Sequence, residues 1–126
     1  MKQEHKELLR RDLCARLPYG IKASYYGADE ECETWDEVDG VAFDYVEIGQ
    51  YSLPIERVKP YLFPLSSMNE EQKMFLKQQN WCIAISTSGT VETTIEGIDC
   101  INKNHFDYRG LIPMGLALDA TGLNVY

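Results

Sequence analysis

The sequence lacks the long apolar run that a membrane helix needs. No stretch of its 126 residues approaches the roughly eighteen apolar residues that cross a bilayer. Its start, MKQEHKELLRRD, carries charges throughout and contains no apolar core of a signal peptide. These absences predict a cytoplasmic protein without membrane association.

Closely spaced metal ligands are also missing. The two histidines, His5 and His105, lie a hundred residues apart, and no two cysteines form a CxxC pair. A zinc site normally contains at least one close ligand pair, and disulfides are rare without a secretion signal. We therefore expect no metal, no cofactor and reduced, mostly buried cysteines. The four cysteines are Cys14, Cys32, Cys82 and Cys100.

Complete catalytic and nucleotide-binding motifs are absent as well. The segment STSGT at 86–90 has hydroxyls and a glycine, but it matches neither a phosphate-binding loop nor a G-x-S-x-G nucleophile turn. A hairpin turn explains it better. The chain also has no internal repeat and no linker, so its length predicts a single domain over residues 1–126.

The composition is that of a globular domain with an acidic excess. Apolar residues make up 44% and charged residues 25%, and 20 acidic against 12 basic residues give a net charge of −8. Such a charge argues against direct nucleic-acid binding. Solubility is its simplest meaning, while an acidic mimic of nucleic acid stays a weaker alternative.

Apolar periodicity and capping residues predict three helices. The first covers about Glu4–Leu17, where leucines recur at every fourth position. The second begins at Ser67 and the third at Thr93, each the first residue of a capping box. They run to about Gln79 and Asn104.

Alternating and β-branched segments predict several strands between these helices. The clearest hairpin turns at Asp39–Gly40, a preferred two-residue turn, and opposes Val38 to Val41. Further strands are predicted over residues 21–26, 51–58, 59–65, 81–87 and 116–120. Because strands and helices do not alternate strictly, we expect an α+β fold: a mainly antiparallel sheet of about four to six strands with about three helices.

The densest charge lies in Asp29–Asp39, where seven of eleven residues are acidic. A calcium loop is excluded, because Trp35 and Val46 would fall at positions that need carboxylates. Four side chains share one face of the predicted hairpin: Glu31, Glu33, Trp35 and Glu37. This face is either a solvated strand surface or an acidic patch for a basic partner.

Tyrosine is abundant in the sheet-forming half of the chain. It suits a half-buried sheet surface, and it is also enriched at protein interfaces. Both interpretations stay open for Tyr19, Tyr25, Tyr26, Tyr45, Tyr51 and Tyr61.

The segment NHFDYRG gathers the residues that look most like chemistry: His105, Asp107, Tyr108 and Arg109. Asp107 could orient His105 for acid–base catalysis, and Arg109 could bind a phosphate or carboxylate. No nucleophile is identifiable. A structural explanation serves as well, in which Asn104 ends the helix in a left-handed conformation and Asp107 accepts backbone N–H groups.

Three segments together resemble a family of uncharacterised small proteins from gut Bacteroides-type bacteria and their prophage-like elements. They are residues 8–23, 58–68 and 104–120, about a third of the chain, with the patterns LCxRLPYG, PYLxPxSSM and FDYRGLIxxGLAL. The resemblance implies a bacterial intracellular protein in a mobile-element context, and it implies no activity.

The sequence therefore favours a small, non-enzymatic accessory or interaction protein with a protein partner. Its expected surface is the tyrosine-bearing sheet face or the acidic hairpin. The alternative is an enzyme or small-ligand binder that uses the residues of NHFDYRG.

Overall fold

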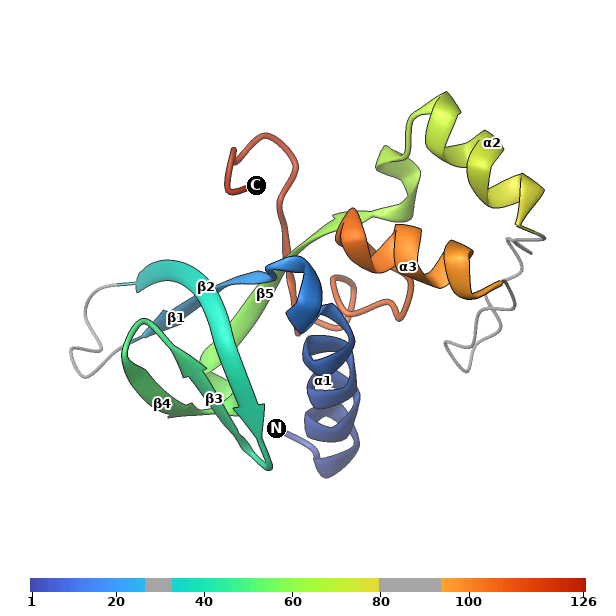
Figure 1. The fold of residues 1–126 in the computed structure, drawn as a ribbon. Helices are drawn as coiled ribbons and strands as arrows, with labels where there is room; N and C mark the ends of the chain where they lie inside the picture. The colour runs from blue at the N-terminus through green and yellow to red at the C-terminus, as the bar shows by residue number, and fades with distance from the viewer. Residues whose placement is uncertain (27–32, 80–93) are drawn as a thin grey trace.

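A computed structural model describes residues 1–26, 33–79 and 94–126 (Figure 1). The α+β prediction is confirmed, with a mainly antiparallel sheet and three α-helices in the described part. The helices are α1 (Gln3–Arg16), α2 (Glu70–Gln78) and α3 (Ile95–Lys103). The strands are β1 (Lys22–Tyr26), β2 (Glu33–Ala42), β3 (Tyr45–Ile48), β4 (Tyr51–Pro54), β5 (Val58–Pro64), β6 (Phe106–Asp107) and β7 (Leu118–Asp119).

The sheet has the order β4-β3-β2-β1-β5-β6, and β7 also pairs with β5. The pairs from β4 to β5 are antiparallel, whereas β5 pairs with β6 and β7 in parallel. Strand β5 therefore joins two halves of the molecule. Figure 1 shows β2–β4 beside α1 at one end, with α2 and α3 at the other end of β5.

The main core lies between α1 and the inner face of the sheet. Leu9 and Leu13 of α1 are fully buried against a cluster that includes Ile21, Val46 and Ile48. Burial of one such side chain stabilises the fold by roughly 2 kcal/mol, so this contact fixes α1 on the sheet. A second cluster packs α2 and α3 against β6 through Met68, Leu76, Ile101, Phe106 and Tyr108.

The C-terminal segment, residues 118–126, covers the outer face of β1 and β5, the face turned away from α1. Tyr61 of β5 is buried there with Ala120 and Val125. The hydroxyl of Tyr126 accepts a hydrogen bond from the backbone N–H of Lys22 (2.9 Å) and donates one to the carbonyl of Tyr61 (2.8 Å). Part of the outer face is thus closed by the chain itself.

The hairpin turn differs from the prediction. The chain turns at Phe43–Asp44, and Asp39–Gly40 lies inside β2, where the register shifts between Val38 and Gly40. This register sets Val38 opposite Ile48 and Val41 opposite Val46, so that apolar side chains from both strands face the core. Burial of a complete strand face outweighed the local turn preference of Asp-Gly.

Two helix caps also differ by one or two positions. Asn69, not Ser67, caps α2, with reciprocal bonds between its side chain and Gln72 N (2.8 Å) and between its N–H and the Gln72 side chain (3.0 Å). Ser67 lies in a 3₁₀ turn and donates to the carbonyl of Pro64. Thr94 caps α3 by accepting from Gly97 N (3.2 Å).

Several sequence-based expectations fall at or beyond the limits of the described residues. The predicted strand at 81–87, the STSGT turn and Thr93 lie outside them. The predicted burial of the cysteines is wrong for Cys14, which is exposed, and Cys100 is only half-buried.

None of the helices in the described part is long and apolar enough to cross a membrane.

Candidate functional site

The segment from Asn104 to Gly115, here called the corner, follows α3 and contains β6. Asp107 accepts two backbone hydrogen bonds in it, from the N–H groups of Leu111 and Ile112 (both 2.9 Å). Each carboxylate oxygen has one of these donors, so Asp107 closes the turn as the structural explanation predicted.

Arg109 binds a carboxylate of the chain's own first helix. Its Nη1 lies 2.7 Å from Oδ1 of Asp12 in α1, and its guanidinium lies 4.4 Å from the centroid of the Tyr108 ring. Asp12 also accepts from Nε and Nη2 of Arg16 (2.9 and 3.1 Å), and both of these side chains are 0% exposed. Arg16 then donates to the carbonyl of Phe106 (2.6 Å). The arginine predicted to bind a ligand therefore fastens the corner to α1.

His105, not Asn104, takes the left-handed conformation after α3, with φ +61°. Asn104 has φ −94° and ψ 7°, and its side-chain amide donates to the carbonyl of Cys100 (2.8 Å). The His105 ring is buried and stacks on Tyr126, with centroids 3.8 Å apart and an angle of 13°. Burial, assisted by the positive charges of Arg16 and Lys22, lowers the pKa of His105 to about 4. The imidazole is neutral at pH 7.

The four corner residues do not form a catalytic constellation. Both carboxylate oxygens of Asp107 bind backbone N–H groups, and no hydrogen bond joins Asp107 to His105 in the described part of the chain. Tyr108 is buried beside two guanidinium groups, and burial raises the pKa of its hydroxyl. What the arrangement does is hold the corner against α1 and the C-terminal segment.

The second candidate surface is the outer face of β2–β4, here called the acidic hairpin. The cross-strand register aligns Trp35 with Ser24 and Glu37 with Lys22, which places both on the face turned away from the core. Glu31 lies outside the described residues, and only the backbone of Glu33 is described. On β3, Tyr45 and Glu47 alternate with the buried Val46 and belong to the same outer face.

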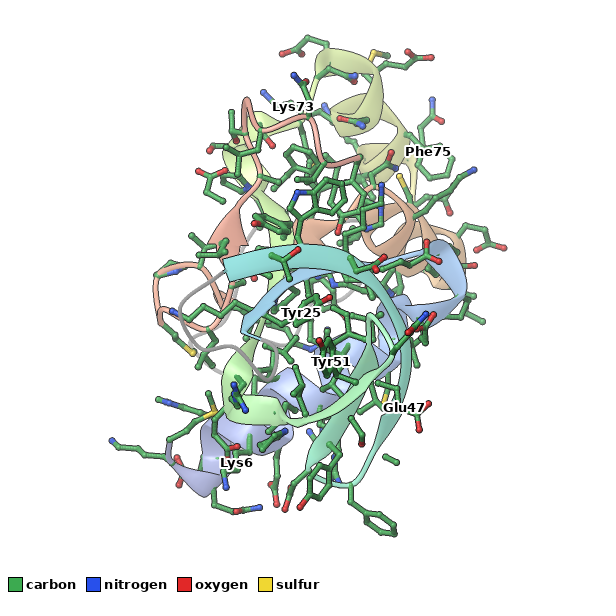
Figure 2. The ribbon with its side chains drawn as sticks, turned by 90° about the vertical axis from the view of Figure 1, so that its left-hand side faces the viewer. Lys6, Tyr25, Glu47, Tyr51, Lys73 and Phe75 are labelled. Carbon is green, nitrogen blue, oxygen red and sulfur yellow. The ribbon has the colours of Figure 1, made fainter. Side chains whose placement is uncertain are left out.

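Large aromatic side chains are exposed on this hairpin. Phe43 at the turn is 83% exposed, Tyr45 is 53% exposed and Trp35 is 47% exposed. The predicted tyrosine face is thereby divided, because Tyr25 and Tyr61 are buried. Figure 2 shows Tyr25 beside Tyr51, with Glu47 projecting away from both; the two tyrosine rings are 6.0 Å apart.

The hairpin region has charge of one sign only. From Ala23 to Glu56 the sequence contains no lysine and no arginine. The same stretch holds ten acidic residues, half of the chain's 20: Asp29, Glu30, Glu31, Glu33, Asp36, Glu37, Asp39, Asp44, Glu47 and Glu56. The described part of this stretch therefore presents aromatic rings among carboxylates, of which Glu56 is paired with Lys6 and Glu37 faces Lys22 across the strands.

Sequence reasoning missed two features of these sites. Asp12 and Arg16 stand four residues apart on a helix, a spacing that favours an ion pair, and this pattern could have been noticed. The exposure of Phe43 could not be anticipated, because the predicted turn placed Phe43 within a strand.

Comparison of the chain with protein-family models, with curated proteins and with solved structures finds no match. In the described residues no group of three or more histidine, cysteine, aspartate or glutamate side chains is placed to hold a metal ion. The function must therefore be argued from the geometry of the two surfaces.

Proposed function

We propose that the chain is a small, non-enzymatic intracellular interaction module that binds a protein partner through the acidic hairpin. The observation that carries the proposal is Phe43. Its φ is +54°, a conformation that costs a residue with a side chain about 1–2 kcal/mol, and its ring is 83% exposed.

The turn itself would favour glycine. Phe43 and Asp44 are the two central residues of a two-residue hairpin turn, and only the first has positive φ, as in a type II′ turn. Glycine is the preferred residue at that position. A phenylalanine there strains the backbone and gains almost no burial, so the fold gives no reason for it. Local strain that the fold does not require is a feature of functional sites.

The surroundings of Phe43 support a protein partner. Exposed aromatic side chains supply most of the binding energy at protein interfaces, because they bury a large area with few rotatable bonds. The carboxylates around them would repel acidic proteins and nucleic acids and attract basic surfaces. A bacterial and mobile-element origin forms part of this proposal and rests on the sequence resemblance alone.

The enzyme alternative receives less support. It required the corner side chains to converge on a ligand, whereas Asp107 and Arg109 bind groups of the chain itself. The nucleic-acid mimic would share the acidic surface, but exposed aromatic rings have no counterpart on a phosphate backbone.

Affinity capture from a Bacteroides-type lysate tests the proposal when it is done with matched variants. The double variant Phe43→Ala/Tyr45→Ala removes two exposed rings from the hairpin. The control Met74→Ala/Phe75→Ala removes two exposed apolar side chains from α2, at the other end of the molecule. We expect to find proteins that the wild type and the control retain but the hairpin variant does not. Recovery that is identical for all three baits would overturn the proposal.

A further inference from the structure

The outer face of the acidic hairpin carries two pairs in which an aromatic ring stands beside a carboxylate. Trp35 and Glu37 form one pair on β2, and Tyr45 and Glu47 form the other on β3. Residues two apart on a strand lie about 7 Å apart on the same face, so each ring and its carboxylate can contact one cation together.

A lysine of the chain itself contacts the ring of the first pair. Lys22 lies directly across from Glu37 in the β1–β2 register, and its Nζ is 5.2 Å from the centroid of the Trp35 ring. The same Nζ donates to the carbonyl of Val125 (2.6 Å) and lies 5.8 Å from the Tyr126 ring. A lysine is therefore the side chain that this part of the face accommodates.

A second example of the same chemistry stands in the corner. The guanidinium of Arg109 lies over the Tyr108 ring while it forms its ion pair with Asp12. Three cations of this chain thus contact aromatic rings: Arg16 and Arg109 are both paired with Asp12, and Lys22 faces Glu37 across the strands.

Among the described residues, the second pair has a ring and a carboxylate but no cation. Glu47 forms no ion pair within the described residues, and Tyr45 is 53% exposed. Its cross-strand neighbours on β2 are small: Gly40 stands opposite Glu47, and Ala42 stands opposite Tyr45. The carboxylate of Glu47 lies over Gly40, with Oε2 only 3.3 Å from the place that a Cβ would occupy. Nothing on β2 covers the pair.

We propose that Tyr45 and Glu47 bind a lysine or arginine side chain from a basic, extended segment of a partner protein. The inference rests on the proposed function and names the chemistry of the partner. Arginine fits best, because a planar guanidinium stacks on the ring and donates to the carboxylate at once. Phe43, two residues before Tyr45, supplies an apolar contact next to the cation. The excess of carboxylates across the hairpin attracts the rest of such a segment.

Titration with an acetylated and amidated hexa-arginine peptide tests the inference at physiological salt. Glu47→Gln and the control Glu71→Gln each remove one carboxylate, but Glu71 is exposed on α2, far from the hairpin. Glu47→Gln is expected to weaken binding about twofold to fivefold, whereas the control changes it less than about 1.5-fold because salt screens distant charges. Tyr45→Leu should cost a similar twofold to fivefold, and Phe75→Leu should cost nothing measurable.

A gain of binding provides the opposite test. Lys22→Met removes the cation from the Trp35 ring, keeps most of the aliphatic stem, and is expected to raise affinity for the peptide about twofold to fivefold. Lys77→Met, which removes one positive charge from α2, should raise it less. The inference would be overturned if Glu47→Gln and Glu71→Gln had equal effects on affinity, or if Lys22→Met and Lys77→Met did. It would also be overturned if the wild type did not bind the peptide at all. Hairpin-dependent capture from lysate could still succeed in that case, so the two proposals can fail separately.

Discussion

The corner and the acidic hairpin both place an aromatic ring next to a carboxylate. They differ in whether the chain also supplies a cation to the ring and the carboxylate. In the corner, Tyr108, Asp12 and Arg109 provide ring, carboxylate and cation, and the set is largely buried. At Tyr45 and Glu47 the chain provides ring and carboxylate and leaves them exposed. The complete set stabilises the fold, whereas we propose that the incomplete set binds a partner.

The largest loss of stability is expected when the carboxylate is removed from the set formed by Tyr108, Asp12 and Arg109. Asp12→Asn leaves Arg16 fully buried without a negative partner and also removes the ion pair of Arg109. We expect a loss of roughly 3–5 kcal/mol in the free energy of unfolding, measured by urea denaturation. Glu7→Gln, an exposed carboxylate on the same helix, should change it by less than about 0.5 kcal/mol. Similar values for the two variants would remove the basis for calling the corner structural.

A substitution on the inner side of the hairpin should lower the free energy of unfolding almost as much. The inner side is packed against the core, so only the outer face is open to a partner. Gly49 has φ +56°, and a Cβ placed on it would lie 2.8 Å from Cζ of Tyr25 and overlap its hydroxyl. Gly49→Ala is expected to cost roughly 2–4 kcal/mol from strain and overlap. Gly122→Ala is the matched control, since its φ is +78° but no atom lies within 4 Å of the added Cβ. It should cost only about 1–2 kcal/mol in the same thermal or urea unfolding experiment.

A pH-dependent effect of intermediate size is expected in the corner. The pKa of His105 is about 4 in the folded chain and about 6.5 when unfolded, so the unfolded state takes up the proton first as the pH falls. The contribution of the neutral ring is fully present above pH 6.5 and is lost progressively toward pH 4. Between pH 7 and 5 this amounts to about 2 kcal/mol.

The variant His105→Asn isolates this contribution. Asparagine tolerates positive φ and does not titrate, so its stability should fall less than that of the wild type over the same pH range. The difference between the two unfolding profiles is the quantity to measure. Superimposable profiles would mean that the pKa of His105 is the same in the folded and the unfolded chain.

The fold class could be predicted because it depends on periodicities that are local in the sequence. The leucine stripe of α1 marks its buried side, and alternation marks β1 and β3. The isoleucine pattern of α3 located the helix but not its buried side, because Ile101 is buried whereas Ile95 is 78% exposed. The exact turn could not be predicted, because Asp39–Gly40 and Phe43–Asp44 compete and the core decides between them. Two polar residues can each cap α2, and the choice of Asn69 over Ser67 depends on the path of the preceding 3₁₀ turn.

The role of Arg109 in the corner could not be predicted from the local sequence, because its partner Asp12 is remote in the chain. Arg109 and Asp12 are 97 residues apart, and nothing local in NHFDYRG indicates that α1 will supply the carboxylate. The role of Asp107 as a cap could be predicted, since its partners are four and five residues away. The hairpin surface was expected from its charge, but its strongest feature, Phe43, required the correct register.

The smallest effect tests the central claim most directly, because it asks whether the exposed ring serves the fold. Phe43→Gly places the preferred residue at the positive-φ position of the turn and removes a side chain that is 83% exposed. The free energy of unfolding, measured by urea denaturation, should rise by about 0.5 kcal/mol, because relief of strain exceeds the added entropy of the unfolded chain. A fall of about 1 kcal/mol or more would contradict the account, because Phe43 would then be stabilising the fold.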